Sequence, residues 1–301
     1  AVALTYRTGE RFRFGEIHVE GAQLVDDFLA SFSTIRPGDW FEADAIGRLS
    51  KDLTASDYFD SVRLNPRPDG GVVDMTVAVV PKRRHAADIG LGFSTDKGPG
   101  LSGRYANRWV NRRGHRYAAD LDIATAERSL ALDYRIPGSR PATTWWSITS
   151  GFKRQSDDGI ESRLQQLGGR WMHHPAWRYR TTRFVEYARE SDITLGTAAE
   201  SFTLGVGWTL RGGDESRRPR RGYRFDLELM GASQTLLSDT TFSRLDGSAK
   251  WIAPLGERLR ILARGRIGWL AARDVDEVPV STRFFAGGDT SIRGFDLNSV
   301  S

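Results

Sequence analysis

Residues 202–210 read Phe-Thr-Leu-Gly-Val-Gly-Trp-Thr-Leu, so every second side chain from Phe202 to Leu210 is large and apolar. Successive side chains of a β-strand point to opposite faces, and this period of two therefore predicts a strand with one apolar face. The same alternation recurs over residues 115–125, 130–136, 223–229 and 259–269. We count about eleven such strands between residues 84 and 270, each close to the length that crosses a bilayer when tilted.

Alternation of this kind fits two architectures. In a soluble β-sandwich the apolar rows meet in a core, whereas in a transmembrane barrel they face lipid. The barrel is favoured because the polar face carries both charge signs, as at Asp133 and Arg135, and because the segments exceed the usual ~5–6 residues of soluble strands. Tryptophans such as Trp208 and Trp269 also fall mostly near segment ends, where an aromatic girdle would lie.

Residues 10–83 follow a different pattern and predict a small α+β domain of order β-α-α-β-β. An alternating strand is followed by two helical stripes and by two strands that flank the turn Asp69-Gly70-Gly71. The expected elements are a strand at 11–21, helices at 24–32 and 41–53, and strands at 58–67 and 72–80. We therefore expect one domain at 10–83 and a partial antiparallel transmembrane β-barrel at 84–301.

Composition limits the function classes. The 301 residues contain no cysteine, which excludes disulfides and cysteine-ligated metals. The formal charge is +5, but the arginines stand singly beside acidic residues on the strands, so we expect no nucleic-acid partner. No run of eighteen apolar residues could form a membrane-spanning helix. The first residues, Ala1–Leu4, lack the features of a signal peptide, which predicts a mature chain or a fragment.

Motifs for catalysis, cofactors and metals are not convincing. Gly98–Gly103 matches G-x-G-x-x-G, but a strand rather than a helix follows it, so we interpret it as a hairpin turn. His173 and His174 would point to opposite faces of a strand, and with Pro175 next to them we interpret them as a turn. We expect no enzyme, no cofactor and no metal site.

The segment from Ala271 onward follows the eleventh strand, and counting from the N-terminal domain places it as a loop outside the cell. Since bacterial single-chain barrels have even strand numbers, a chain that ends in this loop is expected to lack strands. The loop holds Arg283–Phe295, rich in glycine and aromatic residues. It is either a flexible surface loop or a loop folded back into the lumen, with Arg293 bonded to an acid on the inner wall.

Several segments resemble one family. Ile292–Phe295 is similar to the Val/Ile-Arg-Gly-Phe/Tyr loop of the superfamily that includes BamA, TamA and the two-partner secretion transporters. Phe284–Asp289 and Glu277–Pro279 resemble its TamA branch most closely. Residues 10–82 look like a polypeptide-transport-associated (POTRA) domain, with Gly38–Phe41 and Asp57–Val62 at its expected turn and strand entry.

The resemblance implies a barrel of sixteen strands, of which about eleven are present, with a lid-like loop at 283–301. The implied lid-loop motif consists of Gly287, Gly288, Asp289, Ile292, Arg293, Gly294 and Phe295. The implied seam strand, which would meet the last strand of the barrel, contains Ala87, Asp88, Ile89, Gly90, Leu91, Gly92 and Phe93.

The resemblance further implies a non-enzymatic factor of the bacterial outer membrane, with its POTRA domain in the periplasm. It would insert or secrete autotransporter-type proteins by strand templating at the seam. The implied partners are outer-membrane lipids, a TamB-like periplasm-spanning protein and unfolded outer-membrane substrates. A BamA-type general insertase, a two-partner secretion transporter, and a porin or barrel enzyme remain as alternatives.

Overall fold

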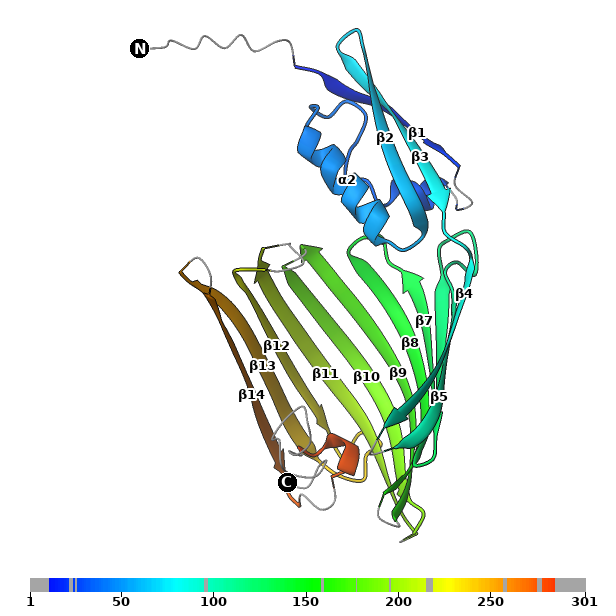
Figure 1. Ribbon diagram of the computed structural model, residues 1–301, viewed down its shortest axis with the longest axis vertical. Helices are drawn as coiled ribbons and strands as arrows, with labels where there is room; N and C mark the ends of the chain where they lie inside the picture. The colour runs from blue at the N-terminus through cyan, green and yellow to red at the C-terminus, as the bar shows by residue number, and fades with distance from the viewer. Residues whose placement is uncertain are drawn as a thin grey trace. The chain divides into compact units, whose positions relative to one another are not determined.

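The computed structural model describes residues 11–284 except 22–23, 25, 95–96, 158–159, 177, 195, 215–218, 257–258 and 275–277. The chain divides into two compact units (Figure 1). The first comprises residues 1–86 together with 107–117 and 137–142, and the second comprises the remaining residues. The lid-loop motif at 287–295 lies outside the described residues.

The first unit contains a three-stranded sheet and two helices. Its elements are β1 (Arg13–Glu20), α1 (Asp26–Ala30), α2 (Ala43–Ala55), β2 (Phe59–Asp69) and β3 (Val72–Pro81). The sheet order is β1-β3-β2, with β1 parallel to β3 and β2 antiparallel to β3. The hairpin between β2 and β3 turns at Gly70 and Gly71, both with positive φ, which glycine adopts without a steric penalty. The predicted order β-α-α-β-β is confirmed.

The core of this unit forms between one face of α2 and the inward face of the three-stranded sheet. Ala45, Leu49 and Leu53 recur every four residues of α2, so they share one face of the helix, and all three are buried. Met75 and Val77 alternate with exposed or half-buried neighbours on β3 and are buried as well. Fully burying one such side chain contributes roughly 1.5–3 kcal/mol, which is why the pattern fixes the face.

An aromatic group completes the core around Tyr58, which is almost entirely buried. Phe28 and Phe32 meet its ring edge-on, with centroids 5.5 and 6.3 Å away. The Tyr58 hydroxyl donates a hydrogen bond to the carbonyl oxygen of Gly114, in the connection 107–117, at 2.5 Å. Burial raises the pKa of Tyr58 far above its usual value, so the hydroxyl remains a proton donor.

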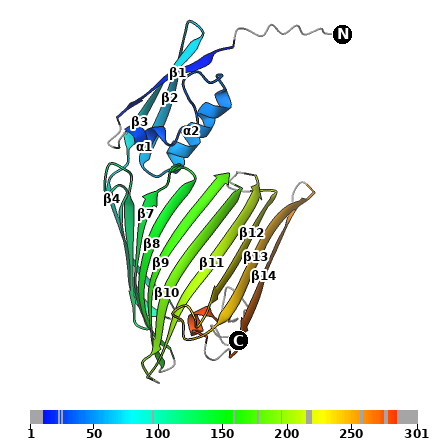
Figure 2. The same ribbon diagram turned by 180° about the vertical axis from the view of Figure 1, so that it is seen from behind.

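The second unit is one sheet of eleven strands, each next to its neighbour in sequence (Figure 2). The strands are β4 (His85–Ser94), β5 (Gly98–Asn107), β6 (Arg116–Ala124), β7 (Glu127–Pro137), β8 (Thr144–Asp157), β9 (Ile160–Ala176), β10 (Tyr179–Asp192), β11 (Thr197–Gly213), β12 (Gly222–Ala232), β13 (Phe242–Leu255) and β14 (Leu259–Ala272). The partial antiparallel barrel and its eleven strands are confirmed. Within the described residues, no helix is long and apolar enough to cross a membrane.

The apolar rows of this sheet lie on its outer face. Leu204, Leu227 and Leu229 are exposed, and each alternates with residues that face inward, such as Asp226 and Glu228. This arrangement is the reverse of a soluble core and agrees with strands that are surrounded by lipid. The sequence interpretation was wrong at His173–Pro175, because β9 continues through these residues to Ala176. The pairing of His173 with Thr144 and Thr181 keeps this segment in the sheet.

Candidate functional site

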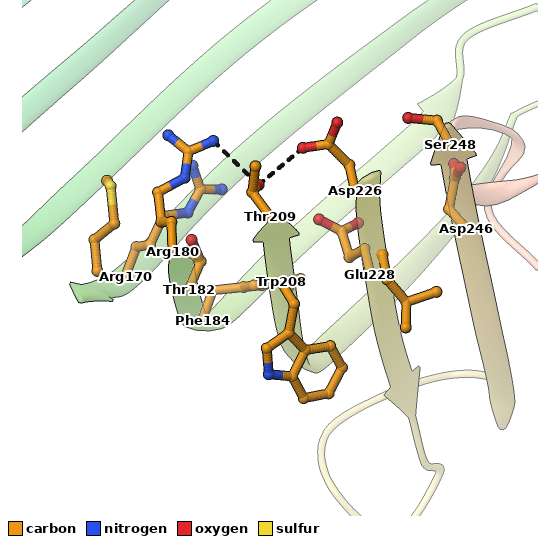
Figure 3. A pocket seen from close by; sticks show the side chains of 13 residues that line it. Arg170, Arg180, Thr182, Phe184, Trp208, Thr209, Asp226, Glu228, Asp246 and Ser248 are labelled. Atoms are coloured by element: carbon orange, nitrogen blue, oxygen red, sulfur yellow. Dashed lines mark hydrogen bonds between the residues drawn. The ribbon is translucent and has the colours of Figure 1, made fainter. Parts of the chain in front are cut away.

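A row of polar side chains crosses the inner face of the sheet from β10 to β14. The strand registers align Arg180 with Thr209, Thr209 with Asp226, Asp226 with Ser248, and Ser248 with Arg266. Alternation places all five on the same face. The Thr209 hydroxyl donates to Asp226 Oδ1 at 2.8 Å and accepts from Arg180 at 3.4 Å (Figure 3).

These side chains border a cavity of about 370 Å³ on the inner wall. Arg170 and Arg180 lie on one side of it, and Asp226, Glu228 and Asp246 lie on the other (Figure 3). At the cavity, the charged lining residues are therefore positive on β9 and β10 and negative on β12 and β13. Such a charged surface is typical of a water-filled barrel interior and would be costly against lipid.

The negative side of the cavity is held by an ionic cluster around Asp246. Its carboxylate is bonded to Arg266 at 2.5 Å and to Arg244 at 3.0 Å, and Glu228 lies 3.9 Å from Arg244. The Arg244 side chain is largely buried, and charge-assisted hydrogen bonds of this kind offset the cost of burying its guanidinium. The cluster fixes Arg244 on the inner face of β13.

The segment after β14, residues 278–284, returns to this wall, and we call it the loop stem. Val278 is 1% exposed and packs with Ala232 and Phe242. The short helix η1 (Val280–Thr282) follows. Both the backbone N–H and the hydroxyl of Ser281 donate to Glu190 Oε2 on β10, at 3.2 and 2.9 Å. The loop stem therefore reaches from β14 to the inner face of β10.

The end of the loop stem is seated by Phe284. The guanidinium carbon of Arg244 lies 4.3 Å from the centroid of the Phe284 ring, a cation–π contact. A Cβ added to Gly268 would come within 2.7 Å of the same ring, so the glycine on β14 leaves the space that Phe284 fills. Arg283 Nε donates to the Val278 carbonyl at 2.9 Å and closes the turn.

The structure places the predicted seam strand at an edge. Residues 87–93 all lie in β4, which is the terminal strand of the eleven-stranded order, beside β5. Ile89, Leu91 and Phe93 are among the most exposed apolar side chains, with Leu91 85% exposed. The lid-loop residues Gly287–Phe295 lie outside the described residues, although the loop stem leads directly to them.

Sequence reasoning did not find Glu190, Arg244, Gly268 and Ser281. Alternation could have placed Glu190 and Arg244 on the polar face of their strands. It could not have paired Glu190 with Ser281, because the two residues are 91 positions apart. Within the described residues, no group of three or more His, Asp or Glu side chains is placed to hold a metal ion.

Comparisons with known families match both parts of the chain. The family described as the Omp85 superfamily domain matches residues 175–301. The POTRA family, described as a surface antigen variable number repeat, matches residues 12–82. The first match thus contains the loop stem and all of the cavity lining except Arg170 and Met172, and the second coincides with the three-stranded sheet and its helices.

Among curated proteins, the chain is similar to the outer membrane protein assembly factor BamA of Nitratidesulfovibrio vulgaris, with 23% identity over 315 aligned positions. The alignment covers 100% of this chain and 40% of that protein, so the chain spans about two fifths of this curated relative.

Two solved structures share the fold. BamA from Haemophilus ducreyi lacking POTRA domains 1–3 has a TM-score of 0.76 and 15% identity, covering 97% of this chain and 61% of that one. CdiB from Escherichia coli has a TM-score of 0.69 and 14% identity, covering 95% and 59%.

Proposed function

The chain belongs to the Omp85 superfamily of outer-membrane β-barrels with periplasmic POTRA domains, and from this premise we propose that it assembles or translocates proteins at the outer membrane. It acts without enzymatic chemistry, by presenting backbone groups and a guided path to an unfolded client. The observation that carries the proposal is the loop stem, which is anchored on the inner wall by Glu190 and Arg244.

The anchored loop stem supports a lid inside the barrel. Because Ser281 bonds to β10 and Phe284 contacts Arg244 of β13, the chain that continues from Phe284 starts on the inner face. The motif Ile292–Phe295 follows within about ten residues, so Arg293 is within reach of an inner-wall carboxylate. We propose that Arg293 forms a bidentate pair there and that Gly294 allows the tight turn beside it.

Strand templating is the proposed mechanism, with β4 as the template. A strand at the edge of a sheet presents N–H and C=O groups that lipid cannot satisfy, so a client strand that pairs with it is stabilised. Gly90 and Gly92 lower the stability of β4 in the sheet, since glycine contributes no side-chain packing to a strand. In this proposal Ala87–Phe93 form the seam at which client strands enter.

The POTRA domain is proposed to bind a periplasmic partner by β-augmentation along β2. This strand is an edge of the three-stranded sheet. The other edge, β1, is already covered at its start, where Phe14 N–H donates to Asp39 and Gly38 N–H donates to Phe14. Pro66 and Pro68 lack a backbone N–H and would end an added strand, which leaves Ser61–Asn65 as the binding segment.

Within this class we propose a TamA-like role in autotransporter assembly, with a TamB-like protein as the POTRA partner. The support is the amino-acid sequence of Glu277–Pro279 and Phe284–Asp289, which is similar to that of the TamA branch. A BamA-type general insertase is the second candidate, favoured by the similarity to the Nitratidesulfovibrio vulgaris BamA along the whole chain. Depletion of the full-length protein in its own host separates the two, because a general insertase would affect porins as well as autotransporters.

Cysteine crosslinking tests the templating mechanism. The chain has no native cysteine, and a Cβ added to Gly92 or to Gly103 meets nothing within 4 Å, so a cysteine fits at either position. Gly92→Cys on β4 in the full-length protein is expected to form a disulfide with a cysteine in the final strand of an autotransporter client. Gly103→Cys on β5, between β4 and β6, is the control. Equal crosslinking at both positions would refute templating by β4.

The proposed lid is tested separately by Arg293→Ala in the full-length protein. Loss of a charged, bidentate pair is expected to lower autotransporter secretion several-fold while the POTRA fold remains intact. Arg293→Lys keeps the charge but not the planar fork, so it is expected to restore only part of the activity. Secretion at the normal rate in Arg293→Ala would remove the lid from the mechanism.

A further inference from the structure

Arg183 faces outward from β10, among apolar residues. The register pairs it with Trp171 on β9 and with Val206 on β11, and its neighbours on the same face are Thr181 and Val185. In the described part of the chain its guanidinium contacts the Trp171 ring, 4.9 Å from the centroid, and is ion-paired with no carboxylate. An arginine on the outer face of a membrane barrel is costly at the bilayer midplane, so an uncompensated one needs a phosphate or water nearby.

The aromatic side chains around Arg183 contact one another in a defined arrangement. Trp171 stacks on His173 with ring centroids 5.5 Å apart and an interplanar angle of 9°, and it lies 6.2 Å from Trp146. The His173 ring is fixed by a hydrogen bond between its Nδ1 and the Thr144 hydroxyl at 3.1 Å. Tryptophan is enriched where one end of the ring meets acyl chains and the other meets headgroups. The group therefore has the composition of a membrane interface.

The position of this group along the strands also agrees with a membrane interface. Trp146 is the third residue of β8, and β8 begins at the end of the sheet where β4 follows the POTRA domain. Arg183 is four residues from the start of β10, about 13 Å along the strand and less along the membrane normal, because barrel strands are tilted. A flexible arginine side chain spans the remaining depth by extending toward the headgroups.

We propose that Arg183, Trp171, Trp146 and His173 form a binding site for the phosphate headgroup of a glycerophospholipid in the periplasmic leaflet. The guanidinium binds the phosphate oxygens with two parallel N–H donors, a geometry that arginine provides and lysine does not. Trp171 supports the opposite side of the guanidinium by the cation–π contact. This site rests on the outer-membrane location of the chain and is independent of the lid and of strand templating.

Native mass spectrometry of the full-length protein with added phosphatidylglycerol tests the site. In Arg183→Gln, the fraction carrying a tightly bound lipid is expected to fall about tenfold, the loss expected for one charge-assisted contact. Arg189→Gln is the matched control, because Arg189 lies on the same face of the same strand but is already paired with Glu200 at 3.3 Å. The control is expected to keep its lipid.

Further probes separate the sources of binding. Diacylglycerol, which lacks the phosphate, is expected to bind weakly, and glycerol phosphate, which lacks the acyl chains, is not expected to displace the lipid. Arg183→Lys and Trp171→Leu are expected to give intermediate losses of bound lipid. Heat-dependent gel mobility shows whether Arg183→Gln is folded, and these two variants test the site if it is not. Equal lipid retention in Arg183→Gln and Arg189→Gln, equal binding of diacylglycerol, or displacement by glycerol phosphate would each overturn the proposal.

Discussion

The strands of the POTRA domain and those of the eleven-stranded sheet share one alternating pattern, but the apolar face is buried in the first and exposed in the second. On β3, Val77 is 2% exposed and points into a core formed with α2, while Val80 on the other face is 54% exposed. On β12, Leu227 is 42% exposed on the outside, and the inward positions hold Asp226 and Glu228. The same period therefore produces a dry core in one unit and a polar interior in the other.

The difference shows that the surroundings, and not the pattern, decide which face is buried. In water, apolar side chains are stabilised by leaving solvent, so they turn toward α2. In a bilayer the lipid takes the place of the core, and the polar row turns toward the water inside the barrel. Substitutions on matched faces of the two units can break or sharpen this comparison.

The largest effect is expected at the core of the POTRA domain. Val77→Lys would bury a charge without a partner, which should unfold the domain, with a loss of more than about 3 kcal/mol. Val80→Lys on the exposed face of the same strand is expected to change stability by less than ~0.5 kcal/mol. Urea denaturation followed by circular dichroism measures both. Similar losses for the two variants would mean that β3 does not have one buried face.

A smaller effect is expected on the outer face of the barrel. Leu227→Arg should lower stability in phospholipid vesicles by up to about 2–4 kcal/mol, depending on its depth in the bilayer. Leu236→Arg is the control, since Leu236 is also exposed but lies in the connection between β12 and β13. Folding titrations in vesicles compare them. If Leu227→Arg is tolerated as well as the control, the outer row does not face lipid.

A still smaller loss of free energy is expected when the hydrogen bonds that anchor the loop stem are removed. Glu190→Ala removes the acceptor of both Ser281 hydrogen bonds, at a cost of roughly 1 kcal/mol because the contact is solvent-accessible. Hydrogen exchange at the Ser281 amide should then accelerate about fivefold. Glu200→Ala on β11, which contacts Tyr187 and Arg189 instead, should leave that amide unchanged. Unchanged exchange in Glu190→Ala would show that Val278 and Phe284 hold the loop stem alone.

The smallest effect concerns Asp57 at the surface of the first unit. Partial burial by itself would raise the pKa of Asp57, but the hydrogen bond from Lys82 and the charges of Lys82, Arg108 and Arg116 lower it overall. A carboxyl with a lower pKa in the folded state stabilises the fold above its unfolded pKa and loses this contribution as the pH falls through the folded pKa.

Asp57→Asn should therefore destabilise the protein at about pH 7 by no more than ~1 kcal/mol, because the pair is half exposed. The difference should shrink as the pH falls through the lowered pKa of the Asp57 carboxyl, because the native side chain then becomes protonated as well. Denaturant midpoints over a series of falling pH values measure it, with Asp60→Asn, on the exposed start of β2, as the control. A difference that is independent of pH would assign the effect to packing.

The sequence predicted the element order of the first unit and the eleven strands of the second, since both follow from local periods in the chain. It was wrong at His173–Pro175, where proline and two polar residues suggested a turn. Pairing of His173 with Thr144 and Thr181 on both neighbours keeps this segment in β9, and such non-local pairing outweighs local turn signals.

The sequence by itself determined which residues alternate, and therefore which side chains share a face, because that periodicity is a property of adjacent backbone units. Only the tertiary structure decided which inner-wall side chains meet. The contact of Ser281 with Glu190 and that of Phe284 with Arg244 and Gly268 depend on strand register and on the path of the chain after β14. No local pattern encodes these, since each joins residues that come together only when the strands have paired and the chain has returned to the sheet.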